Sequence, residues 1–222
     1  MNGFDARQWG RLRCALILLL PQLPLAPPAI AADPWTACGR AIAVAERGTG
    51  VPPGLMLAIA RVESGRPAPT GGVAPWPFAI NADGGSHFPN TAEAAIAQVT
   101  ALRARDIRSV DVGCMQVNLL HHPGAFPDLD TAFDPTANVA YAAHFLGELR
   151  ARTGNWAEAV AQYHSAVPGR GLAYHSRVTI SRVAGGTALG TPRTLAGLCA
   201  PGRQARVVVA PNGRPRLLCR GR

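Results

Sequence analysis

The sequence predicts a mainly α-helical (α+β) domain with one small β-hairpin, followed by a basic C-terminal extension. Apolar residues recur at helical spacing through most of residues 35–183, turn residues interrupt this pattern between residues 76 and 88, and the pattern ends after Val183. The chain has 222 residues, 48% hydrophobic and 16% charged. This length and composition suit one folded domain with a core of its own.

The first 31 residues have the features of a secretory signal peptide. Three arginines precede an apolar run at residues 15–20, and Ala29-Ile30-Ala31 supplies the small residues of a cleavage site. The segment is too short and too rich in proline to be a spanning helix, and no later stretch approaches the ~20 apolar residues that such a helix needs. We therefore expect export, with the mature protein in the periplasm.

Capping and turn residues set the boundaries of the expected elements. Pro52-Pro53 suits the opening turn of a helix that Gly65 ends. The segment 90–93 (Asn-Thr-Ala-Glu) resembles a capping box that opens the next helix, Asp134 is an N-cap, and Asn155 opens a further helix. The turn sequence 82–85 (Ala-Asp-Gly-Gly) predicts the hairpin. We expect residues 111–120 to form a loop that runs into a short helix. The expected helices cover residues 35–47, 54–64, 91–105, 134–152, 155–163 and 171–183.

The net charge of +9 is concentrated in the extension, residues 184–222, and the helix before it. Residues 179–222 contain eight arginines and no acidic residue, whereas residues 32–178 carry a net charge of −1. Within the extension only Val207–Val209 and Leu217-Leu218, around Pro211-Asn212-Gly213, predict a small β-unit. The extension can anchor the protein to an anionic wall or membrane, dock on a protein partner, or remain a disordered tail.

Four cysteines follow the signal peptide, which in an oxidising compartment predicts two disulfides. Three pairings exist. We expect Cys38–Cys114 in the main domain and Cys199–Cys219 in the extension, because the second pair brackets the expected β-unit. Buried free thiols are the alternative, and no cysteine spacing is typical of a zinc site.

Four short segments stand out as candidate chemistry: Arg61-Val62-Glu63-Ser64-Gly65, Asp111-Val112-Gly113-Cys114-Met115-Gln116-Val117-Asn118, Asp134-Pro135 with Asn138, and Gln162-Tyr163-His164-Ser165. In this order they resemble the Glu-Ser, Gly-Leu-Met-Gln and Ala-Tyr-Asn motifs of lysozyme-like lytic transglycosylases of the soluble-transglycosylase (SLT) type. The resemblance covers about residues 36–178. It implies a lysozyme-like fold for residues 32–183 and peptidoglycan strands as the substrate.

The resemblance assigns Glu63 as the catalytic acid and base of an exported peptidoglycan lytic transglycosylase, a lyase. Such an enzyme cleaves the β-1,4 bond between N-acetylmuramic acid (MurNAc) and N-acetylglucosamine (GlcNAc) and closes a 1,6-anhydro ring. One carboxyl group suffices because the C6 hydroxyl of the sugar attacks instead of water. The expected position of Glu63, in the last turn of a helix, disfavours its ionised form.

The same resemblance implies roles for further residues. Tyr163 would orient Glu63, although its helical spacing from Trp156 and Val160 also suits a core position. The substrate-binding residues would be Ser64, Met115, Gln116, Asn118, His164 and Trp76. Met115 could equally fill a gap in the core, and Trp76 could stack on a sugar or pack in the core.

The sequence also departs from the family pattern. Cys114 replaces the usual leucine, which the expected disulfide would explain, and His164-Ser165 replaces Asn-Ala, although histidine can donate a comparable hydrogen bond. Glu63 and Gly113 are 50 positions apart, as in small transglycosylases that serve secretion systems, conjugation machines or flagella. A component of such machinery is therefore a candidate partner of the extension.

Two other functions remain open at this stage. A hydrolytic muramidase, as in goose-type lysozymes, would need a second carboxylate to activate water. Asp111 is the first candidate and Asp83 the second, although the sequence favours a loop-capping role for Asp111. A non-catalytic wall-binding or assembly protein with the same fold is the other. His121-His122 does not have metal-ligand spacing. We expect a monomer with no cofactor, no metal and no nucleic-acid partner.

Overall fold

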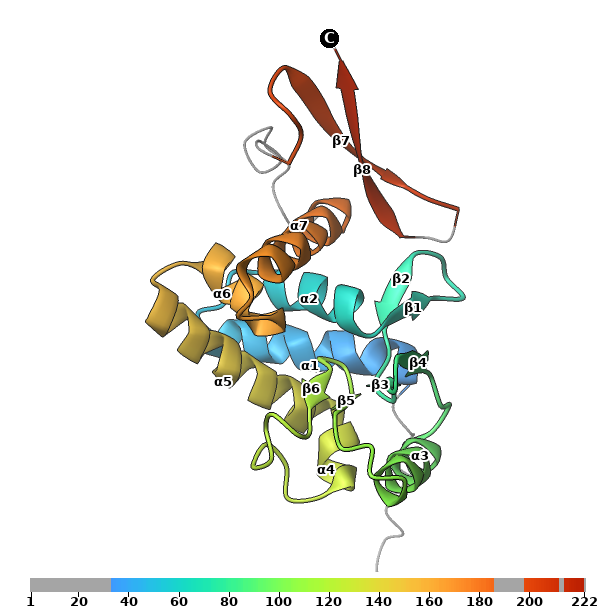
Figure 1. Ribbon diagram of the computed structural model, residues 1–222. Helices are drawn as coiled ribbons and strands as arrows, with labels where there is room; N and C mark the ends of the chain where they lie inside the picture. Colours follow the sequence, from blue (N-terminus) through green and yellow to red (C-terminus); the bar gives the residue numbers. More distant parts are fainter. Residues whose placement is uncertain (1–32, 186–197, 212–213, 222) are drawn as a thin grey trace, which may run out of the picture. The chain divides into compact units, whose positions relative to one another are not determined.

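The computed structural model describes residues 33–185, 198–211 and 214–221. Its mainly helical architecture confirms the expected fold class (Figure 1). The helices are α1 (Pro34–Thr49), α2 (Leu55–Glu63), α3 (Ala92–Ala104), α4 (Leu129–Phe133), α5 (Pro135–Thr153), α6 (Trp156–His164) and α7 (Pro168–Ala184). The strands are β1 (Gly65–Pro67), β2 (Val73–Pro75), β3 (Ile80–Ala82), β4 (Gly85–His87), β5 (Val110–Val112), β6 (Val117–Asn118), β7 (Arg203–Val209) and β8 (Pro215–Gly221).

The expected capping segments begin their helices, and within the capping box at residues 90–93 the N-cap is Thr91. The side chains of Thr91, Asp134 and Asn155 accept hydrogen bonds from backbone N–H groups in the first turns of α3, α5 and α6, at 3.2, 2.8 and 2.8 Å. Each cap satisfies a donor that the helix itself leaves unpaired. Helix α7 begins at Pro168, three residues before the expected start, because proline is well suited to a first helical turn.

The expected hairpin is formed by β3 and β4. Asp83 (φ 53°) and Gly84 (φ 75°) form its two-residue turn, and these left-handed conformations are those that a tight hairpin turn requires. On its other side β3 pairs with β5, and β5 pairs with β6, so the sheet order is β4-β3-β5-β6. The prediction of a loop over residues 111–120 was therefore wrong in part: β5 and β6 gain their hydrogen bonds from neighbouring strands, which a local pattern does not show.

Two apolar clusters form the core of residues 33–185. The larger lies among the helices, where α1 packs on α5, α5 on α6, α6 on α7, and α7 on α2 (Figure 1). The smaller is built from α3, α4 and the strands β3 and β5, with Ile80, Val99 and Phe133 among its buried members. A helical lobe and a smaller lobe that holds the sheet therefore face each other.

A disulfide joins Cys38 of α1 to Cys114, with the Cα atoms 5.7 Å apart, as expected. It ties the turn between β5 and β6 to the first helix.

Within the extension, β7 and β8 pair antiparallel and the Cys199–Cys219 disulfide closes the unit, which confirms the predicted pairing and β-unit. The alternative prediction of a disordered tail is therefore wrong for the described residues of this hairpin. The predicted signal peptide lies outside the described residues. None of the helices in the described part of the chain has the length and apolar character needed to cross a membrane.

Candidate active site

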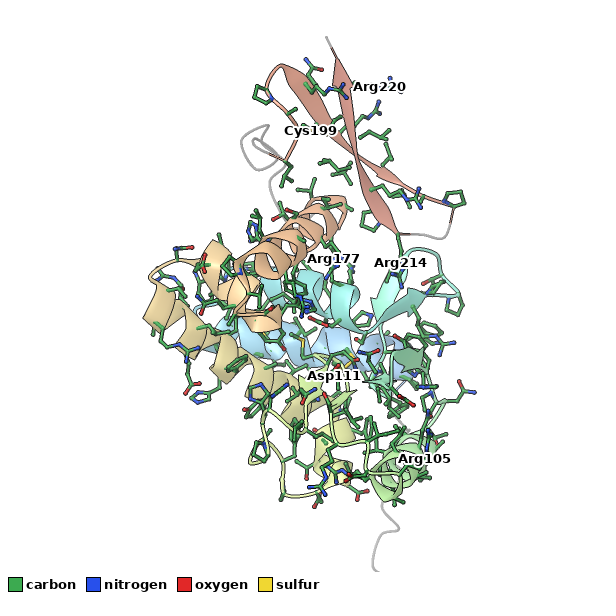
Figure 2. The ribbon with its side chains drawn as sticks, in the orientation of Figure 1. Arg105, Asp111, Arg177, Cys199, Arg214 and Arg220 are labelled. Atoms are coloured by element: carbon green, nitrogen blue, oxygen red, sulfur yellow. A yellow bond between two sulfur atoms is a disulfide. The ribbon has the colours of Figure 1, made fainter. Side chains whose placement is uncertain are left out.

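A cleft separates the two lobes, and Glu63 lies in it at the end of α2. Helices α2, α5, α6 and α7 line it from one lobe, and β3, β5, β6 and the turn between β5 and β6 line it from the other. Figure 2 labels Asp111 and Arg177, which come to the cleft from β5 and α7. The predicted residues that line it are Glu63, Gln116, Asn118, Tyr163 and His164.

Partial burial and neighbouring charges set the acidity of Glu63. Burial raises the pKa of its carboxyl from 4.5 to about 7. The Tyr174 hydroxyl opposes this rise, the negative charge of Asp111 adds to it, and the Arg177 guanidinium lowers the pKa again. Because Glu63 is also the last residue of α2, the negative end of the helix dipole faces it. The carboxyl group can therefore hold a proton close to neutral pH, as a general acid requires.

Tyr174 is the tyrosine that interacts directly with Glu63. It is fully buried on α7, and its hydroxyl stabilises the carboxylate of Glu63, although their contact falls outside the geometry of a regular hydrogen bond. The ring of His164 stacks on the ring of Tyr174, with centroids 4.6 Å apart and planes 7° apart. Tyr174 is thus held in place from the cleft side.

The expected orienting role of Tyr163 takes a different form. Its hydroxyl donates a hydrogen bond of 2.9 Å to the backbone oxygen of Met115. Burial raises the pKa of Tyr163 well above its usual value, and the nearby charge of Glu63 adds to this effect. Tyr163 therefore lies close to Glu63 but fixes the turn opposite it, and Tyr174 makes the direct contact.

Asn138 fixes the turn between β5 and β6 by side-chain hydrogen bonds. This buried side chain donates to the backbone oxygens of Val112 and Ala132, both at 3.0 Å, and accepts from the backbone N–H of Met115 at 2.9 Å. Gly113 has a φ of 80°, and a Cβ atom there would collide with the amide of Asn138. Only glycine satisfies both the backbone conformation and the close approach.

Gln116 is the cleft residue that this turn presents. Its φ of 50° is unusual for a residue with a side chain, and such conformations cluster at functional sites. Its amide donates to the backbone oxygens of Ala79 and Gly113, both at 3.1 Å. These bonds leave its side-chain oxygen as an acceptor beside the cleft.

Asp111 is the second carboxylate of the cleft. One of its oxygens accepts from the amide of Asn81 at 3.0 Å and the other from the amide of Asn118 at 2.7 Å. These three residues lie on adjacent strands, β3, β5 and β6, at paired positions. The amides fix the carboxylate on the sheet side of the cleft, where its charge acts on Glu63.

The family comparison agrees with this geometry. The model of the transglycosylase SLT domain matches residues 40–170, more than half of the chain, and this range includes α2, α5, α6 and the strands β3, β5 and β6 that line the cleft. The chain belongs to the transglycosylase SLT family. Comparisons with curated proteins and with solved structures gave no match. Membership supports a peptidoglycan-cleaving function of the lytic transglycosylase type, exerted outside the cytoplasm.

Three residues of this SLT domain that were expected to bind substrate lie elsewhere. Ser64 is buried, and its hydroxyl donates to the backbone oxygen of Cys114 at 2.6 Å, so it joins α2 to the turn. Met115 is buried in the larger core cluster. Trp76 is buried, packs on the Trp35 ring at a centroid distance of 4.8 Å, and donates to the backbone oxygen of Pro89 at 2.7 Å. All three residues are buried, and none of them lines the cleft.

The sequence-based assignment of the SLT domain also missed residues that the fold brings to the cleft. Tyr174 is the main one. Its spacing from Val178 and Ser181 marks the buried face of α7, and a buried tyrosine needs a partner for its hydroxyl, which is the signal that could have identified it. Arg61 and Arg177 also line the cleft; Arg61 belongs to the Glu63 segment but was given no role, and Arg177 lies in none of the four segments.

Proposed function

We propose that this SLT-family protein is an exported lytic transglycosylase that cleaves the MurNAc–GlcNAc β-1,4 bond and releases a 1,6-anhydro-MurNAc end. The observation that carries the proposal is the carboxyl group of Glu63, which lies in a cleft between two lobes and has a pKa of about 7. Such a group exchanges its proton readily in both directions near neutral pH, which a catalyst that acts first as acid and then as base requires.

The proposed reaction has two proton transfers through the same carboxyl group. Glu63 first donates its proton to the glycosidic oxygen, the bond from that oxygen to C1 of MurNAc breaks, and the GlcNAc end leaves as an alcohol. The C6 hydroxyl oxygen of the same MurNAc then bonds to C1, and its proton passes to the Glu63 carboxylate. Glu63 is thereby reprotonated, and no water enters the product.

The neighbours of Glu63 would support these steps by charge and position. Cleavage develops positive charge at C1, and the Asp111 carboxylate, fixed by Asn81 and Asn118, is placed in the cleft to stabilise it. Tyr174 stabilises the carboxylate form that exists between the two transfers. Gln116 and His164 offer polar groups along the cleft for sugar hydroxyl or acetamido groups.

A hydrolytic muramidase is the second candidate, and Asp111 is the observation that favours it. This carboxylate lies near enough to Glu63 to raise its pKa, and a second carboxylate is what water activation requires. Both of its oxygens already accept amide hydrogen bonds, however, which suits a fixed charge better than a base that exchanges protons.

Glu63→Gln tests the proposed chemistry against a non-catalytic wall-binding role. Purified wild-type protein incubated with glycan strands should release fragments with anhydro ends, identified by mass spectrometry. The variant keeps the shape of the side chain but carries no exchangeable carboxyl proton, so it should bind strands and release none. Equal release by the two proteins would refute the assignment of Glu63.

The place of action and the role of the basic hairpin belong to the same proposal. The signal-peptide features of residues 1–31 support export to the periplasm. The hairpin β7–β8 lies in a segment without acidic residues, which suits binding to anionic wall polymer, membrane or a component of a secretion system or flagellum. A variant that ends after residue 185 should cleave soluble strands normally but lose its localisation; lost activity with unchanged localisation would contradict this role.

A further inference from the structure

The α2 and α7 wall of the cleft carries two arginines that form no salt bridge with an acid among the residues the structure describes. Arg61 lies two residues before Glu63 on α2, and Arg177 lies three residues after Tyr174 on α7. Both line the cleft, and Figure 2 labels Arg177 on α7. The ion pairs formed among the described residues, Arg105–Asp83, Arg108–Asp106 and His144–Glu148, do not involve them.

Arg61 is the more constrained of the two. It is partly buried, and burial lowers the pKa of its guanidinium. Its terminal nitrogen packs so closely against Gly185, just after α7, that a Cβ atom on this glycine would collide with it. The guanidinium is therefore held at the cleft wall. A partly buried cation without a counter-ion is costly unless an anion arrives to pair with it.

The cleft itself offers little to neutralise these charges. Among the described residues that line it, the acids are Glu63 and Asp111. Glu63 must carry a proton to start the reaction, and Asp111 is bound by Asn81 and Asn118. Residues 179–222 contain no aspartate or glutamate, so no side chain after residue 178 can supply one. A substrate that enters this cleft meets the guanidinium groups of Arg61 and Arg177 on the α2 and α7 wall, and Arg177 is near enough to Glu63 to lower its pKa.

We propose that Arg61 and Arg177 bind a carboxylate carried by the MurNAc unit that is cleaved. The inference rests on the proposed function, which places C1 of that sugar at Glu63. MurNAc differs from GlcNAc by a lactyl ether at O3 of the same ring, so its carboxyl chain is necessarily near the reacting atom. Guanidinium groups bind carboxylates with paired, charge-assisted hydrogen bonds. The arginines thereby select MurNAc over GlcNAc at this position.

The carboxylate has two sources in the cell wall. In stripped strands the lactyl group ends in a free carboxylate, whereas in intact strands it is joined to a stem peptide that has carboxylates of its own. Three soluble substrates separate them: strands with stem peptides, strands stripped by an amidase, and stripped strands whose lactyl carboxyl is capped as a neutral methylamide. Initial rates over a range of strand concentration then give KM and kcat for each.

Arg61→Gln and Arg177→Gln should each raise KM about tenfold on at least one charged substrate and leave KM on the capped strands unchanged. A rise on stripped strands identifies the lactyl carboxylate, and a rise confined to peptide-bearing strands identifies the peptide. Rates are compared below the pKa of Glu63, because Arg177 also lowers that pKa. Arg177→Lys keeps the charge and should restore most of the affinity.

Arg103→Gln is the matched control, because it removes the same charge from an exposed position on α3 that does not line the cleft. The inference is overturned if the two cleft variants show the KM of Arg103→Gln on both charged substrates, or if KM rises equally on the capped strands. Arg177 is exposed, so its variants remain informative even if Arg61→Gln does not fold. Anhydro products from the wild type report on the proposed function separately, whatever the arginines do.

Discussion

Replacing Glu63 by glutamine should stabilise the protein at alkaline pH and leave its stability unchanged at acid pH. The pKa of this carboxyl is raised from 4.5 to about 7 in the folded protein, so the fold retains a proton that the unfolded chain has released. The free energy of unfolding therefore falls as the pH rises from 4.5 to 7, and the full penalty is present above 7. Glutamine has a similar shape and no charge, so it removes this penalty.

The size of the effect follows from the shift in pKa. Each tenfold change in acidity corresponds to roughly 1.4 kcal/mol, which gives a ceiling of about 3 kcal/mol for a rise from 4.5 to about 7. Glu63 is partly exposed in the cleft, and water there screens its charge. We therefore expect a gain of about 1–3 kcal/mol above neutral pH.

Urea unfolding of the wild type and of Glu63→Gln at about pH 4 and about pH 9 measures this difference. Glu148→Gln is the control, because Glu148 is 56% exposed on α5 and its replacement should change stability little at either pH. A constant difference between the wild type and Glu63→Gln across this range would show that Glu63 is not held in an environment that favours its protonated form.

The remaining predictions concern the support of Glu63 and of the fold. The alkaline limb of the pH profile of kcat/KM is set by the pKa of Glu63 at about 7. It should move to lower pH in Asp111→Asn, which removes a neighbouring negative charge, and to higher pH in Tyr174→Phe, which removes a hydroxyl that stabilises the carboxylate. Shifts of both variants in the same direction would contradict these assignments. Asn138→Ala should cost about 2–4 kcal/mol in urea unfolding, because it leaves three buried backbone groups unpaired; a loss below about 1 kcal/mol would contradict this. Cys38→Ser should lower the free energy of unfolding by about 2–5 kcal/mol relative to the oxidised wild type. Reduction of the wild type should lower it too, and an unchanged free energy of unfolding after reduction would contradict this prediction.

Much of the helical framework could be predicted from the sequence because its signals are local. These signals are the capping box at residues 90–93, the caps at Asp134 and Asn155 and the turn at Asp83-Gly84; each acts within a few residues, and each element begins or turns where expected. Glu63 was identified for a similar reason, since its place at a helix end and its motif are both contiguous in the sequence.

The contacts that the sequence did not show are those between distant segments. Ser64 binds Cys114 across 50 residues, and this contact decides that it is a structural residue. The Trp76 side chain points into the core because the Trp35 ring packs against it, and no local sequence pattern specifies this contact. Tyr174 was missed because it approaches Glu63 only once α7 packs on α2.

The origin of the atoms in the product tests the central claim most directly. Glycan strands digested in water labelled with heavy oxygen should yield anhydro-MurNAc ends that contain no label, because the C6 hydroxyl of the sugar, activated by Glu63, closes the ring. Reducing MurNAc ends that carry one labelled oxygen would show that water is the nucleophile. That result would contradict the account and favour a muramidase in which Asp111 assists water.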